Sequence, residues 1–358
     1  MPDYLSRRNK LRKLFEDYAQ ASVFFDQVSI RYLTGFSGSN AALLVSQDEK
    51  SDLLLTDSRY TKRAEVEATD IEARIDRNFI KNIKEILMKE KIKNVAIDPK
   101  LINVATSESL TKDLDIKLVK FEDFLSPLRM IKDEYEIKQI KKACAITADT
   151  LWFLINDLRP GMTEKQISQL LLEGFLKRGA DGLAFASIVA SGKNSATPHH
   201  EPTKKEIERG DMVTIDCGAL VNGYHADMTR TVFIGSCADW QKDIYLAVMN
   251  SQNLGREKLQ PGISAEEVDQ TCREYIEKAN YGQYFVHGTG HGVGLEIHEP
   301  MFLVKDVKTK LSVGNCVTVE PGIYLPDKGG VRIEDTCLVT QTQAEVLTPG
   351  SHELICVA

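Results

Sequence analysis

The chain has 358 residues, of which 42% are hydrophobic and 27% are charged, a composition typical of a folded protein. The formal net charge of −7 and the lack of a basic block argue against nucleic acid or an anionic membrane as partner. Seven scattered cysteines without a CxxC pair predict neither a disulfide framework nor a cysteine zinc site. No apolar run approaches the roughly 18 residues that span a bilayer. Residues 1–10 lack the apolar stretch of a secretory signal, so the cytoplasm is the expected compartment.

Helix and strand signals alternate over the first 125 residues, which favours an α/β domain. An amphipathic helix is predicted over 5–18. Further helices are expected near 59–67, 79–89 and 105–113, and strands at 22–25, 41–45, 52–55, 95–97 and 116–119. Residues 35–40 are rich in glycine and serine but fit neither the dinucleotide nor the P-loop spacing, so we interpret them as a turn.

The pattern changes near Pro127, where we place the domain boundary. Proline discourages helix in the residue before it, and a long charged amphipathic helix is predicted over 133–157. We therefore predict an N-terminal domain over 1–125, a linker over 126–133 and a second domain over 134–358.

The second domain contains an internal duplication. Three pairs of segments match in the same order, at offsets of 101, 104 and 107 residues: 159–163 with 260–264, 210–218 with 314–322, and 227–229 with 334–336. In the first pair, Thr163 and Ser264 each precede a Gln or Glu by three residues, the pattern of a capping box that opens a helix. We predict two copies of a helix-then-hairpin unit, packed about a pseudo-twofold axis.

Acidic residues stand at equivalent places in the two predicted hairpins. Strand alternation puts Asp216 on the face of Thr214, and Glu320 repeats this in the second copy. Asp227 and Glu334 are expected on the returning strands, so each hairpin presents two carboxylates on one face. Four converging carboxylates repel one another unless protons or cations neutralise them. Two divalent metal ions match their formal charge.

A further ligand is predicted in residues 287–299, which contain three histidines and four glycines. The alternating glycines disfavour a helix and permit close backbone approach, and the segment is not the helical HExxH zinc motif. Oxygen-rich ligation with one imidazole suits Mn²⁺ or Co²⁺, with Zn²⁺ and Fe²⁺ as alternatives. His199, which follows a proline in a polar loop, is taken by itself as structural or exposed.

Such a site is suited to hydrolysis, because two metal ions lower the pKa of bound water and polarise a carbonyl oxygen. Glu320 could shuttle the proton to the leaving nitrogen, and histidines could stabilise the tetrahedral intermediate.

At these residues the chain resembles the pita-bread metallopeptidases, the family of creatinase, aminopeptidase P and prolidase. The similarity covers essentially the whole chain, and its motifs are 215–218, 226–231, 287–294, 320–322 and 330–335. It implies an α+β architecture, with a duplicated pita-bread catalytic domain and a smaller creatinase-like α/β N-terminal domain. It also implies two divalent metal ions, Mn²⁺ first and Co²⁺ or Zn²⁺ as alternatives, on five ligands: Asp216, Asp227, His291, Glu320 and Glu334.

The resemblance assigns further roles by position. Glu320 becomes the general base and acid, His199 lies near the scissile bond, and His298 stabilises the tetrahedral oxyanion. His287 and Arg332 are expected at the substrate, with Arg332 supporting the site through hydrogen bonds. Asp227 and Glu334 are the expected metal bridges.

The implied function is that of a dinuclear metal-dependent exopeptidase, a hydrolase that cleaves the bond between an N-terminal residue and a following proline. Residues 32–39 and 55–60 look more like those of short bacterial aminopeptidase P, which we favour, with Xaa-Pro dipeptidase (prolidase) as the alternative. A non-catalytic pita-bread binding protein is a remote alternative, because all five ligands are present. The expected partners are a peptide or dipeptide with proline second and another copy of the chain in a homodimer, with no nucleic acid and no membrane.

Overall fold

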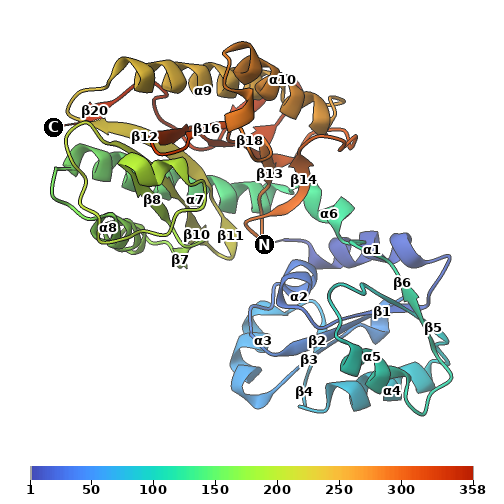
Figure 1. Ribbon diagram of the computed structural model, residues 1–358. Coiled ribbons are helices and arrows are strands. Elements are labelled where there is room, and N and C mark those ends of the chain that lie inside the picture. Colours follow the sequence, from blue (N-terminus) through green and yellow to red (C-terminus); the bar gives the residue numbers. More distant parts are fainter. Residues whose placement is uncertain (1, 358) are drawn as a thin grey trace. The chain divides into compact units, whose positions relative to one another are not determined.

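The computed structural model describes residues 2–357 and divides into two compact units that meet between Arg129 and Met130 (Figure 1). Within the described residues, none of the helices combines the length and the apolar character needed to cross a membrane. The predicted boundaries of the domains and the linker stay a prediction, and each unit is described below by itself.

The smaller unit is built on a six-stranded mixed sheet in the order β4-β3-β2-β1-β5-β6. β1 pairs antiparallel with β2 and β2 with β3, whereas the other neighbours are parallel. The strands are β1 (Ala21–Phe24), β2 (Ala41–Ser46), β3 (Leu53–Thr56), β4 (Glu72–Ile75), β5 (Asn94–Ile97) and β6 (Lys117–Lys120). The helices are α1 (Tyr4–Phe15), α2 (Gln27–Thr34), α3 (Thr61–Glu67), α4 (Phe79–Lys89) and α5 (Val104–Thr111). A core of aliphatic side chains from β1, β2, β3, β5 and α4 holds this unit together.

Three elements here differ from the sequence-based expectation. Neither α2 nor β4 was predicted, and a short helix, α6 (Ser126–Met130), occupies part of the expected linker. Pro127 is compatible with α6 because it lies in the first turn, where its missing N–H is not needed. The glycine-rich turn begins at Gly35, which ends α2 in the left-handed conformation with φ of 79°.

In the larger unit, two helix pairs flank the strands: α7 (Glu134–Asp157) with α8 (Glu164–Lys177), and α9 (Asp239–Lys258) with α10 (Ala265–Lys278) (Figure 1). One sheet has the order β20-β12-β9-β8 and another β14-β13-β15-β18-β19. The strands of these sheets are β8 (Ile188–Ser191), β9 (Met212–Cys217), β12 (Met228–Ile234), β13 (Gly290–Gly292), β14 (Glu299–Leu303), β15 (Cys316–Val319), β18 (Asp335–Val339), β19 (Ala344–Val346) and β20 (Cys356–Val357). The remaining strands are β7 (Gly182–Leu183), β10 (Ala219–Val221), β11 (Tyr224–His225), β16 (Gly322–Leu325) and β17 (Gly329–Arg332).

The predicted duplication is visible in the backbone. Both capping boxes form, at Thr163 before α8 and at Ser264 before α10. In the first copy the Ile207 N–H donates to the Met162 carbonyl at 2.9 Å, and in the second Leu311 donates to Ile263 at 2.8 Å. Each copy therefore closes its turn in the same way and passes into the same kind of hairpin, β9–β12 or β15–β18.

Candidate active site

The five residues predicted as metal ligands come together in the larger unit. Asp216 lies on β9 and His291 on β13, whereas Glu320 directly follows β15. Asp227 and Glu334 were expected on the returning strands, but each lies one residue before its strand, β12 or β18. Because these two residues precede their strands, the alternation of side chains along a strand does not fix the direction in which theirs point.

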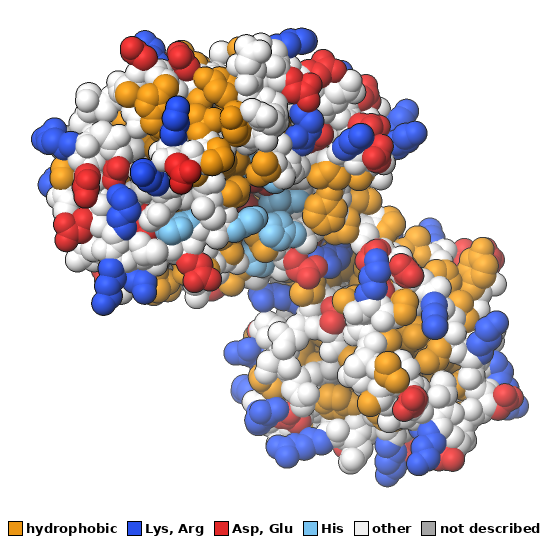
Figure 2. All heavy atoms as spheres, in the orientation of Figure 1, with side chains coloured by type: hydrophobic (Ala, Val, Ile, Leu, Met, Phe, Trp, Pro, Cys, Tyr) orange, Lys and Arg blue, Asp and Glu red, His pale blue; other side chains and the backbone are white. Residues whose placement is uncertain are grey.

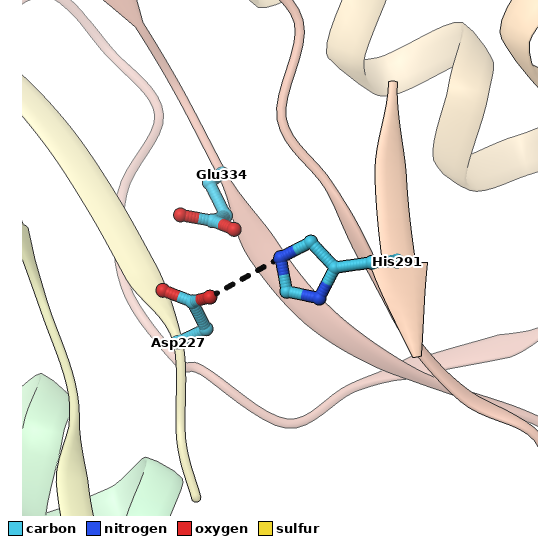
Figure 3. Close-up of side chains that lie close together, drawn as sticks. All are labelled: Asp227, His291 and Glu334. Atoms are coloured by element: carbon cyan, nitrogen blue, oxygen red, sulfur yellow. Dashed lines mark ion pairs between the residues drawn. The ribbon is translucent and has the colours of Figure 1, made fainter. Parts of the chain in front are cut away.

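Asp227, His291 and Glu334 point toward one another from three different segments (Figure 3). One ligand atom from each lies within 4.8 Å of the others, and all three residues are buried. The Nε2 atom of His291 is 3.5 Å from a carboxylate oxygen of Asp227 and 3.5 Å from one of Glu320. These separations leave room for a cation among the side chains rather than direct hydrogen bonds.

The tautomer of His291 follows from its neighbours. Its Nδ1 is 3.0 Å from the Gly292 carbonyl, which can only accept, so Nδ1 carries the hydrogen. Burial lowers the pKa of His291 to about 4, so the ring is neutral and Nε2 presents a lone pair. A lone pair facing the carboxylates of Asp227 and Glu320 is repulsive unless a proton or a metal ion lies between them.

The carboxylates show the same demand for positive charge. Burial and neighbouring acids raise the pKa values of Asp227 and Glu334 well above their usual range. Burial, together with the charge of Asp216, raises the pKa of Glu320 to about 8. A buried cluster of this kind is held ionised by bound cations.

Asp216 supplies an oxygen that is free for such an ion. Its Oδ2 accepts a hydrogen bond from Arg332 at 2.7 Å. Its Oδ1 is buried, and within the described part of the chain it has no hydrogen-bond partner. A buried unpaired carboxylate oxygen is costly, and metal coordination would remove that cost.

Arg332 begins a chain of hydrogen bonds that reaches His287. Its Nη1 donates to the Tyr324 hydroxyl at 2.8 Å, and that hydroxyl lies 2.8 Å from His287 Nε2. The Nδ1 of His287 donates to the Gly288 carbonyl at 2.8 Å, and therefore Nε2 accepts from Tyr324. Burial and the charge of Arg332 lower the pKa of His287 to about 4, which keeps the ring neutral.

All the predicted site residues line one cavity of about 760 Å³. Histidine side chains gather on the visible face of the larger unit beside hydrophobic ones (Figure 2). The ring of His298 meets that of His291 edge-on, at a centroid distance of 4.3 Å. Burial lowers the pKa of His298, and the nearby charge of His199 lowers it further. His199, taken by itself as structural or exposed, lies in this cavity.

Three buried residues around the cavity were not singled out from the sequence: Glu164, Asp269 and Tyr324. Glu164 accepts from His200 at 2.9 Å, and Asp269 accepts from the N–H and hydroxyl of Thr289 at 3.1 and 2.8 Å. Each has a partner that is distant in sequence, beyond the reach of local spacing rules: His200 is 36 residues from Glu164, Thr289 is 20 from Asp269 and His287 is 37 from Tyr324. The one sequence feature that could have pointed to Glu164 is the duplication, because the equivalent position in the second copy is Ala265, which has no carboxylate.

Comparisons with known proteins find matches to both units of the chain. A model of metallopeptidase family M24 matches residues 138–341, and a model of the creatinase/prolidase N-terminal domain matches 7–131. The chain is 36% identical to an Xaa-Pro dipeptidase of Pyrococcus furiosus, over 98% of this chain and 99% of that one. The solved structure of an Xaa-Pro dipeptidase from Bacillus anthracis matches with TM-score 0.95 and 34% identity, over 99% and 100% of the two chains. An X-Pro aminopeptidase from Thermotoga maritima matches with TM-score 0.91 and 35% identity, over 97% and 100%.

Proposed function

The chain belongs to metallopeptidase family M24, and we propose that it is an Xaa-Pro exopeptidase that acts with two divalent metal ions. The hydrolase class, the creatinase-like N-terminal domain and the pita-bread catalytic domain follow from the comparisons and confirm the predicted fold and enzyme class. The observation that carries the proposal is the convergence of the duplicated carboxylates and the lone pair of His291 in one cavity.

The residues present fit two divalent ions. The two ions would be held among the five side chains that line the cavity: Asp216, Asp227, His291, Glu320 and Glu334. Bound ions of this kind lower the pKa of a water molecule and polarise a carbonyl oxygen. Mn²⁺ is our first choice and Co²⁺ or Zn²⁺ the alternatives, because the donor set is rich in oxygen.

The side chains of the site would then divide the remaining work. Glu320 takes a proton at its carboxylate from the attacking water and returns it to the leaving nitrogen. His298 lies against His291 and would donate to the oxyanion, and His199 would contact the substrate near the scissile bond. Arg332 holds Asp216 in place, and His287 lies at the substrate-facing end of the same hydrogen-bond chain.

Selection for proline has a physical basis. The bond before proline lacks an N–H, and the ring fixes φ, so enzymes that read an extended backbone fail there. Hydrophobic side chains line part of this cavity, among them Phe185, Ile297 and Phe302, and could receive the ring.

We place dipeptides ahead of longer peptides as substrates, although the N-terminal motifs favoured aminopeptidase P. The support is the full-length similarity to the Pyrococcus furiosus dipeptidase and to the Bacillus anthracis dipeptidase structure. Longer peptides remain the second candidate because of the Thermotoga maritima aminopeptidase structure. The predicted cytoplasmic location and homodimer stay predictions.

The test compares Ala-Pro with Ala-Pro-Ala and with Ala-Ala, using protein loaded with each of Mn²⁺, Co²⁺ and Zn²⁺. We expect cleavage of both proline substrates, with the dipeptide preferred, and little cleavage of Ala-Ala. Preference for the tripeptide would move the assignment to aminopeptidase. Equal cleavage of Ala-Ala would contradict the proline requirement.

A further inference from the structure

Glu164 is a fully buried acid at the start of α8. Its Oε1 accepts from the N–H of Ser191 at 2.8 Å, from the Ser191 hydroxyl at 2.8 Å and from Asn194 Nδ2 at 2.9 Å. Its Oε2 accepts from His200 Nε2 at 2.9 Å, from the N–H of Thr203 at 2.9 Å and from the Thr203 hydroxyl at 2.7 Å. One carboxylate thus accepts six hydrogen bonds, all from residues in the segment 191–203.

These donors come from both ends of a segment that carries two cavity histidines, His199 and His200. The middle of the segment is held separately, because Arg332 Nη1 donates to the Pro198 carbonyl at 3.3 Å. His199 therefore lies between one residue tied to Arg332 and another tied to Glu164. The position of the His199 ring in the cavity depends on both ties.

The charge of Glu164 suits this task. Burial opposes ionisation, but hydrogen bonds from Asn194, His200 and Thr203 outweigh it and lower the pKa of Glu164 to about 2. An ionised carboxylate can only accept, so His200 must carry a hydrogen on Nε2. The tautomer and orientation of His200 are set by Glu164.

The second copy of the duplicated unit shows that the helix itself needs no acid here. The equivalent residue, Ala265, is also fully buried at the first position of its helix, α10. In both copies this residue donates its N–H to a carbonyl of the following loop, Lys205 at 3.1 Å or Thr309 at 2.9 Å. The carboxylate of Glu164 is therefore an addition that only the first copy carries.

We propose that Glu164 is a positioning residue for the peptidase reaction: its carboxylate fixes the segment 191–203 and so places His199 and His200 at the substrate. The inference rests on the proposed function for its kinetic readout. Its structural readout, the order of this segment, is independent of any activity.

The main test is Glu164→Gln, which keeps the shape of the side chain but turns one oxygen into a donor facing three donors. The matched control is Glu267→Gln in the second copy, where Gln166 of the first copy already performs the same capping. For E164Q we expect kcat to fall about 10- to 100-fold, with a smaller change in KM and unchanged metal content. E267Q should match the wild-type enzyme.

A double-mutant cycle separates positioning from general loss of structure. If Glu164 acts through His199, then E164Q should cost far less in the His199→Ala background than in the wild-type enzyme. A loss of kcat that is equal in the two backgrounds, or a kcat within twofold of wild type, overturns the proposal.

Hydrogen exchange reads the segment directly. E164Q should speed the exchange of amides in 191–203 by about tenfold or more, and leave 285–291 unchanged. Unchanged exchange in 191–203 overturns the proposal, even if the wild-type protein fails to cleave Xaa-Pro peptides and the proposed function is lost. Should E164Q not fold, Thr203→Val removes one donor and should lower kcat roughly 2- to 10-fold. A wild-type kcat for T203V would then count against the proposal.

Discussion

The two halves of the catalytic unit share a scaffold but contribute differently to the site. Each supplies two carboxylates from equivalent places, Asp216 and Asp227 or Glu320 and Glu334. Within the described residues, only the second half contributes a histidine, His291, to the buried group that could hold a metal ion. The duplicated hairpins thus place four carboxylates, Glu320 among them, in a nearly symmetric arrangement, whereas the histidines of the cavity lie on segments outside the duplicated motifs.

In both halves a buried acid on a helix anchors a loop that carries histidines, but the acid stands at a different helix position in each half. In the first half, Glu164 at the start of α8 ties the segment of His199 and His200. In the second, Asp269 lies one turn further along α10, accepts from Thr289 and pairs with Arg273. Arg273 in turn donates to the His287 carbonyl at 2.8 Å. A buried helix acid that holds a histidine loop is therefore common to both halves, although its position is not.

The largest expected effect is at the ligand that has no counterpart in the first half. His291→Ala should remove bound metal and abolish measurable Xaa-Pro cleavage, because the carboxylates alone would lose their neutral nitrogen donor. Metal analysis and peptide hydrolysis check this. His225→Ala, which removes an imidazole outside the cavity, should retain the metal. Full activity of H291A would show that His291 is not needed for metal binding or for cleavage.

Glu320→Gln should be next in size. The amide cannot carry a proton between water and leaving group, so kcat should fall about 10²- to 10⁴-fold, the usual contribution of general acid–base catalysis. The measurement is kcat on a saturating Xaa-Pro substrate, with metal content recorded alongside. A decrease of less than tenfold with metal in place would remove Glu320 from its assigned role.

Tyr324→Phe tests the hydrogen-bond chain that runs from Arg332 to His287 in the second half. The change leaves His287 Nε2 and Arg332 without the shared hydroxyl, and an unsatisfied buried group costs about 1–3 kcal/mol. We expect a lower free energy of unfolding in urea and a modest loss of kcat/KM. If the variant keeps wild-type stability and activity, the hydrogen bonds of the Tyr324 hydroxyl contribute to neither.

The metal-free protein should lose stability as pH rises through the window from about 7 to about 8.5. Glu320 has a folded pKa of about 8 against 4.5 for the free side chain, so the folded state binds more protons there than the unfolded state. His287 and His291, with folded pKa values of about 4 against 6.5 for the free side chains, oppose this trend only weakly above pH 7, where both states are mostly neutral. Thermal melts at pH 7 and 8.5 measure the trend.

Bound metal should flatten this dependence, because the ions replace the protons as the neutralising charge. Metal-free melts that rise with pH over the same window would contradict the assigned charge cluster.

The smallest expected effect concerns the capped helix starts that the two halves share. Thr163→Ala and Ser264→Ala each remove the side-chain cap of one duplicated helix, and each should cost about 1 kcal/mol in the free energy of unfolding. Equal costs, measured by urea denaturation, support equivalent scaffolds. A large difference between them would show that the two helix starts are not equivalent.

Periodicity, capping and repetition predicted a good part of this fold. α4 has the predicted bounds, and α7 differs by one residue, because both carry long amphipathic patterns. β4 escaped prediction because it is only four residues long and partly exposed. α6 escaped because the rule for residues before proline was applied to a helix start, where it does not hold.

For the site, the ligand set was read from repeated spacing and from the resemblance. The roles of those residues stay predictions, although the structure brings all of them to one cavity. Glu164 and Tyr324 could not be found in this way, because their partners are distant in sequence and their types are common. A comparison of the two copies position by position would have marked Glu164, since a buried acid opposite Ala265 calls for an explanation.

Two metal ions held by the two hairpins and His291 are the basis of the proposed Xaa-Pro hydrolysis. The most direct measurement is the titration of metal-free protein with Mn²⁺, following Ala-Pro hydrolysis and bound metal together. We expect no activity without metal and a rise in activity that saturates at two ions per chain. Full activity of the metal-free protein, or no cleavage of Ala-Pro with Mn²⁺, Co²⁺ or Zn²⁺ bound, would contradict it.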